Sequence, residues 1–197
     1  MNISNLLSQL EQHLHTSVTE VAHRLQPGLP ANHIDELFRS IDICVPESIF
    51  LLYQWKNGVL QSNDNIIYGE LFSNGIFYDL ATAIAVYVVN SVENNYVDKR
   101  FFPLFTSGGG DYVMIALDEV VDGDASLYLY SPALNLSAIP VPIYSSIAKM
   151  LQAIFLCYQA GAYYFKDREL VINHELEGRI SGSINPDAPF WQEGSKL

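Results

Sequence analysis

The chain has 197 residues, of which 49% are hydrophobic and 16% are charged, and its formal net charge is −12. This composition indicates a globular domain with a full core and excludes a disordered chain. The acidity argues against a nucleic-acid binder and against docking on anionic membranes, because both draw affinity from lysine and arginine. It suits solubility, or a basic protein partner.

The N-terminal residues, MNISNLLSQLEQHLH, lack the basic start and apolar core of a signal peptide. The longest nearly apolar run, DLATAIAVYVVN, is too short to span a bilayer. Cys44 and Cys157 lie in apolar sequence outside any CxxC pair, which predicts two buried thiols in a reducing compartment. We therefore expect a soluble cytoplasmic protein.

Helical patterns come first along the chain. Leucines and valines spaced by three and four predict an amphipathic helix over residues 3–25, which QPGLP ends. Asn32 can cap a second helix that runs through about Ile41. Pro46 fits the first turn of a third helix, and Asn57-Gly58 is expected to stop it.

Strand patterns begin at Asn65. The short aromatic runs NIIYGELF and GIFYDL predict two strands around a turn at 73–75. Residues 81–95 could form a helix or a strand, and we favour a helix because Asp79 can cap it and alanines recur. Three further strand-like runs are RFFPLFTS, DYVMIALDE and SLYLYSP, and the second is apolar on both faces, which predicts a central strand.

A long helix over 145–165 and a turn-rich tail complete the chain, and the tail is expected to pack through Phe190 and Trp191. Strands without a helix after each one favour an α+β fold over a doubly wound sheet. We predict a single mixed, mainly antiparallel sheet with helices packed against it and an extra N-terminal helix. The expected parts are an N-terminal helical extension (1–29), an α+β domain (30–165) and a C-terminal tail that packs on it (166–197).

Gly108-Gly109-Gly110-Asp111 could suggest a phosphate loop, a metal loop or a turn. A phosphate loop needs a lysine after its glycines, and dinucleotide-binding glycines lead into a helix. Here an aspartate and a predicted strand follow instead, so we predict a turn between two antiparallel strands.

The remaining candidate sites carry no recognisable chemistry. The acidic segment DEVVDGDASLYL lacks the calcium-loop spacing, which favours a solvated hairpin tip. The histidines and cysteines have no zinc spacing, and His174 lacks the second histidine of HExxH. We predict no catalytic residue, no metal and no cofactor. Twelve tyrosines and ten phenylalanines are expected mainly in the core, although a tyrosine-bearing sheet rim with carboxylates would resemble a protein-binding surface.

Two stretches resemble the SUKH superfamily, which includes yeast cell-wall assembly regulators and many bacterial immunity proteins. VPESIFLLYQWKNGV (45–59) is similar to the family's N-terminal helix, which begins at a proline and ends in Asn-Gly. FFPLFTSGGGDYVMIALDE (101–119) resembles its paired strands around a glycine turn, and SSIAKMLQAIFLCY stands where its closing helix would be. The resemblance covers about 34–165. The tryptophan that often begins the first paired strand is replaced here by Phe101 or Phe102.

The resemblance implies an α+β domain without enzymatic activity, and its bacterial members bind and neutralise toxins, often nucleases. An acidic protein can occupy the cationic site of a nuclease, so we predict a basic toxin domain as the partner. The candidate binding residues are Asp111, Tyr112, Asp118, Glu119, Asp122 and Asp124. A regulatory scaffold for an endogenous partner is the alternative, and an enzyme is the third possibility.

Overall fold

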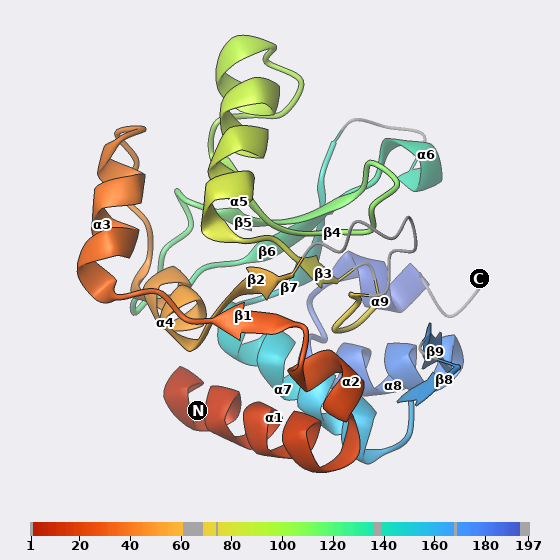
Figure 1. Cartoon of the computed structure of the whole chain (residues 1–197). Helices are drawn as coiled ribbons and strands as arrows, with labels where there is room; N and C mark the ends of the chain where they lie inside the picture. The colour runs from red at the N-terminus through yellow and green to blue at the C-terminus, as the bar shows by residue number, and fades with distance from the viewer. Residues whose placement is uncertain (1, 61–68, 74, 136–138, 168, 194–197) are drawn as a thin grey trace.

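The computed structural model describes residues 2–60, 69–73, 75–135, 139–167 and 169–193 (Figure 1). The helices of the first half are α1 (Ile3–Ser17), α2 (Thr19–Ala22), α3 (Ala31–Arg39), α4 (Glu47–Trp55) and α5 (Leu80–Tyr87), which the π-helix η1 (Val88–Glu93) continues. Those of the second half are α6 (Pro132–Asn135), α7 (Ile147–Gln159), α8 (His174–Ile184) and α9 (Pro189–Glu193).

The central sheet has five strands in the order β3-β4-β5-β6-β7, and each neighbouring pair is antiparallel. The strands are β3 (Ile76–Phe77), β4 (Phe101–Thr106), β5 (Tyr112–Ala116), β6 (Leu127–Tyr130) and β7 (Val141–Tyr144). Two small antiparallel sheets accompany it, β1 (Leu25–Pro27) with β2 (Lys56–Val59) and β8 (Tyr163–Lys166) with β9 (Glu169–Ile172). The predicted α+β class and the central position of β5 are confirmed.

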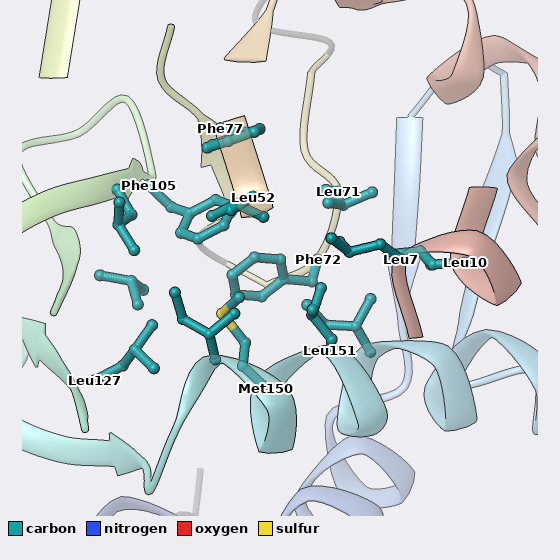
Figure 2. Packing of buried hydrophobic residues seen from close by; sticks show 14 of the residues in the cluster. Leu7, Leu10, Leu52, Leu71, Phe72, Phe77, Phe105, Leu127, Met150 and Leu151 are labelled. Carbon is teal, nitrogen blue, oxygen red and sulfur yellow. The ribbon is translucent and has the colours of Figure 1, made fainter. Parts of the chain in front are cut away.

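The inner face of the central sheet packs against the helices in a hydrophobic core. Phe72 lies at the centre of this packing, between Phe105 of β4 and Met150 of α7 (Figure 2). The rings of Phe72 and Phe105 meet edge to face with centroids 5.0 Å apart. Leu7 and Leu10 of α1 belong to the same cluster, so the N-terminal helix and the sheet share one core.

Strand β4 carries a bulge at Leu104. The register with β5 shifts between Pro103 and Phe105, so Leu104 is the extra residue and both Leu104 and Phe105 reach the core. Strand β3 pairs only with the last two residues of β4. Pro103 therefore lies where no ladder hydrogen bond from its nitrogen is required, which is why a proline is accepted in this sheet.

Several predicted helix boundaries are wrong. Asn32 does not cap the second helix, because α3 begins at Ala31 and its N-cap residue is Pro30. The helix predicted over 3–25 ends at Ser17, and a short second helix leads into β1. The predicted stop at Asn57-Gly58 lies inside β2, because α4 already ends at Trp55. These two residues instead join β2 to α5: Asn57 Oδ1 accepts a hydrogen bond from the Leu80 amide at 2.9 Å. A Cβ on Gly58, whose φ is +76°, would lie 2.2 Å from the nitrogen of Asp79, so only glycine fits.

Other local predictions have mixed outcomes. Asp79 caps α5 as expected, because its Oδ1 accepts from the Thr82 amide at 3.0 Å. The helix predicted over 145–165 ends at Gln159, where Gly161 at φ +72° turns the chain into β8. Cys157 is buried as predicted, but Cys44 is exposed and precedes α4. The first half of NIIYGELF (65–68), and Asn74 of the predicted turn, lie outside the described residues; from Gly69 on, only Glu70 forms a bridge, with Ile76.

The tail covers the β7 edge of the central sheet. Trp191 Nε1 donates a hydrogen bond to the carbonyl of Ile143 at 2.6 Å, and its ring packs on Tyr144 with centroids 5.6 Å apart. Phe190 lies edge-on to Trp191 at 4.8 Å. The predicted packing of these two aromatic residues is confirmed, and it occupies an edge carbonyl that could otherwise pair with another strand.

Candidate functional site

The outer face of the central sheet is the side opposite the main core. Strand alternation places on it Phe101, Pro103, Tyr112, Met114, Ala116, Tyr128 and Tyr130. Phe101, Met114 and Ala116 are buried and, with Val97, form a second hydrophobic cluster. The three tyrosines are half-buried around it. The result is an aromatic surface on which polar hydroxyl groups stay within reach of a partner.

Arg100 lies over one end of the outer face. Its guanidinium carbon is 4.4 Å from the centroid of Phe101 and 6.0 Å from that of Tyr128, which is cation–π geometry. Nη1 lies 3.5 Å from Asp118 Oδ2 and 3.4 Å from Glu119 Oε1. This end of the face therefore holds one of the chain's own cations between aromatic rings and two carboxylates.

Glu119 is also fixed by a tyrosine. The Tyr128 hydroxyl donates to the carboxylate, with its oxygen 2.7 Å from Oε1 and 2.9 Å from Oε2. Burial, together with this bond to an anion, raises the pKa of Tyr128 to about 12. The phenol therefore remains protonated and remains a donor at neutral pH. Asp118 is the more exposed of the two carboxylates.

The other end of the outer face carries a row of tyrosines, which we call the tyrosine row and which consists of Tyr78, Tyr112 and Tyr130. Their ring centroids are 6.5 Å apart between Tyr78 and Tyr112 and 6.1 Å apart between Tyr112 and Tyr130. The planes of both pairs differ by about 30°. All three rings are half-buried, so part of each ring reaches solvent.

The glycine turn next to the tyrosine row is a hairpin, as predicted, and β4 and β5 pair antiparallel on either side of it. Gly108 and Gly110 have φ values of +79° and +101°, which L side chains rarely adopt. Ser107 Oγ donates to Asp111 Oδ2 at 3.0 Å, and the Asp111 carbonyl accepts from Thr106 Oγ1 at 3.0 Å. Asp111 is thus held at the end of the hairpin, directly before Tyr112.

A shallow hollow opens where the outer face meets η1. Asn90 and Ser91 of η1 face Phe101, Pro103 and Tyr112 across it. Its cavity volume is only about 10 Å³, which is far below the roughly 300–1,000 Å³ of small-molecule pockets. The hollow therefore has room for about one water molecule and not for a ligand or a partner's side chain.

The remaining two predicted residues lie in the turn between β5 and β6. Asp122 is exposed, with φ +51°. Asp124 caps α7 instead of facing solvent: Oδ1 accepts from the Ile147 amide and Oδ2 from the Ala148 amide, each at 3.0 Å. Its charge lies at the positive end of the helix dipole. The carboxylate of Asp124 is therefore engaged within the fold.

The six candidates do not form one cluster. Asp118 and Glu119 meet at the Arg100 end, whereas Asp111 and Tyr112 lie at the hairpin end. Sequence reasoning missed Arg100, Tyr78 and the outward orientation of Tyr128 and Tyr130. The alternation of tyrosine with leucine in LYLY was the available signal for the last two, because it places both tyrosines on one face.

A buried polar cluster lies elsewhere, between α7, α8 and β8. The Tyr163 hydroxyl donates to Glu177 Oε1 at 2.5 Å, and His174 Nδ1 lies 3.2 Å from Oε2. Burial raises the pKa of Glu177, although both partners oppose the shift. Burial also raises the pKa of the Cys157 thiol to about 12, which keeps it protonated and unreactive. Within the described ranges, no three His, Cys, Asp or Glu side chains are arranged to hold a metal ion.

No protein-family model matches the chain, and the search of curated proteins finds no match to it. Among the helices in the described part of the chain, none combines the length and the apolar character that crossing a bilayer requires.

Proposed function

We propose that this chain is a non-enzymatic protein-binding module, specifically an immunity protein that neutralises a basic toxin by occluding its cationic site. The observation that carries the proposal is the outer face, where half-buried tyrosines lie between carboxylates at both ends. Tyrosine is enriched in protein interfaces because one ring supplies contact area and a hydrogen bond. The net charge of −12 favours a cationic partner.

The proposal assigns different roles to the candidate residues. Tyr112 is the anchor at the hairpin end of the face, and Asp111, Asp118 and Glu119 form the charged rim that steers the partner. Asp122 adds an exposed charge in the neighbouring turn. Asp124 contributes indirectly, because its carboxylate caps α7. The resemblance of residues 45–59 and 101–119 to the SUKH superfamily supports the toxin-neutralising form of this function.

The test is co-expression with the toxin candidate encoded by the neighbouring reading frame, scored by survival and by calorimetry on the purified pair. The wild-type chain is expected to restore growth. Asp118→Lys is expected to weaken binding by about tenfold or more, because it places like charges opposite each other. Glu175→Lys is the matched control, since Glu175 is an exposed carboxylate on α8.

Salt provides the second readout. Affinity is expected to fall between about 50 mM and about 500 mM salt, because exposed charges are screened over a shorter distance. A salt-insensitive interaction, or no protection by the wild-type chain, would contradict the proposal. Binding of a cellular protein through the same face without protection would favour the regulatory scaffold instead.

A further inference from the structure

We propose that the tyrosine row, Tyr78, Tyr112 and Tyr130, binds an arginine side chain of the protein partner. This inference rests on the proposed function and specifies the chemistry by which the outer face recognises its partner. It adds a cation-binding role for Tyr78 and Tyr130, which the candidate set predicted from the sequence does not include.

The first support comes from the opposite end of the same face. There the guanidinium of Arg100 already lies 4.4 Å from the ring centroid of Phe101, with Asp118 and Glu119 within 3.5 Å of Nη1. The guanidinium of Arg100 thus contacts aromatic rings on one side and carboxylates on the other. The outer face is chemically suited to a guanidinium, as its own residue demonstrates.

The tyrosine row presents the same kinds of group. Three ring faces follow one another at 6.5 and 6.1 Å, and Asp111 precedes the middle ring in the chain. A cation within about 6 Å of a ring centroid is attracted by the ring's quadrupole. A nearby carboxylate adds attraction that reaches several ångströms at moderate salt.

The row distinguishes between the two long cationic side chains. Arginine suits the site better than lysine, because its planar guanidinium stacks on rings and is less strongly hydrated than an ammonium group.

The experiment is a nuclear magnetic resonance titration of the full chain with blocked oligo-arginine, oligo-lysine and oligo-citrulline peptides. Oligo-arginine is expected to shift the ring resonances of Tyr112 and Tyr130, with weaker shifts from oligo-lysine. Citrulline has nearly the shape of arginine without the charge, so its peptide is expected to leave these rings unshifted.

Two variants locate the site. Tyr112→Leu is expected to weaken oligo-arginine binding by about two- to fivefold, because an aliphatic group has no quadrupole. Tyr112→Phe keeps the ring and is expected to retain binding, which also provides a folded comparison. Tyr164→Leu is the control, since Tyr164 is an exposed ring on β8.

The inference is overturned if oligo-arginine leaves the Tyr112 and Tyr130 rings unshifted, or if oligo-citrulline shifts them equally. Equal weakening by Tyr164→Leu would overturn it as well. These failures can be distinguished from failure of the proposed function. If the wild-type chain protects cells but its tyrosine row does not bind arginine, the proposed function holds and only this inference is rejected.

Discussion

Glu177 brings a carboxylate into the interior between α7 and α8, where Tyr163, His174, Tyr144 and Cys157 surround it. Burial raises its pKa above the ordinary value of 4.5. A raised pKa in the folded state means that this group stabilises the fold below pH 4.5 and that the contribution is lost as pH rises through the folded value. Ionised Glu177 therefore lowers the unfolding free energy at neutral pH.

The variant Glu177→Gln removes this dependence, because the amide oxygen still accepts from Tyr163 but cannot ionise. We expect the unfolding free energy of the variant, relative to wild type, to increase as pH rises above about 4.5 and to level off once pH passes the raised folded-state pKa. Urea unfolding across that range measures it. Glu175→Gln, an exposed change on the same helix, should show a constant difference, and a constant difference for Glu177→Gln would refute the assignment.

Asp122 and Asp124 are neighbours in the sequence with different structural roles. Replacing Asp124 by asparagine removes one of the carboxylate oxygens that accept from the start of α7, along with the favourable charge. We expect a loss of about 1 kcal/mol in unfolding free energy. Asp122→Asn should change stability by less than about 0.5 kcal/mol, because Asp122 is exposed and asparagine tolerates its positive φ. Equal losses in the two variants would contradict the capping role.

The β4–β5 hairpin is the element on which the site depends, because it orients Tyr112 and Asp111. Gly110 has φ +101°, whereas Gly109 lies outside that positive range and a Cβ there would meet only Ser107 Oγ at 3.5 Å. We expect Gly110→Ala to cost about 1–2 kcal/mol and Gly109→Ala to cost less than about 0.5 kcal/mol. Thermal unfolding of both variants is the measurement, and the reverse order would show that the turn is not held as described.

Most elements could be predicted from local patterns. Leucine spacing identified α1, Asp79 and the alanines identified α5, and β-branched and aromatic runs identified β4, β5 and β6. Boundaries failed where a long-range contact decides them. Asn57-Gly58 has a helix-stop signature, yet the residues are used for close approach to α5. Nothing within the local window around position 57 encodes that contact.

At the scale of the molecule, α1 and the central sheet bury their apolar residues in one cluster. Leu10 is fully buried there, so Leu10→Ala should cost about 2–5 kcal/mol, because a cavity remains. We expect a single cooperative unfolding transition in the wild type and in the Leu10→Ala variant. Leu60→Ala is the control, with the parent leucine 63% exposed. A small loss, or two separate transitions, would show that α1 folds as an independent extension.

The candidate face could be predicted only in part from the sequence, because its composition depends on contacts between distant residues. Acidic residues and Tyr112 were identified because charge and hairpin position are local properties. The tyrosine row brings together residues from the end of β3, from β5 and from β6, so its composition depends on strand order and register. The hydrogen bonds between the Asp124 carboxylate and the start of α7 likewise join residues that are more than twenty positions apart in the sequence.

The two thiols differ in a way that has a practical consequence. Cys44 is exposed in front of α4, whereas Cys157 is inaccessible inside α7. An alkylating dye should modify the native chain once, at Cys44, and reach the second sulfur only when α7 separates from its neighbours. Counting the mass additions over time would then report how often the interior opens, with no engineered probe in the protein.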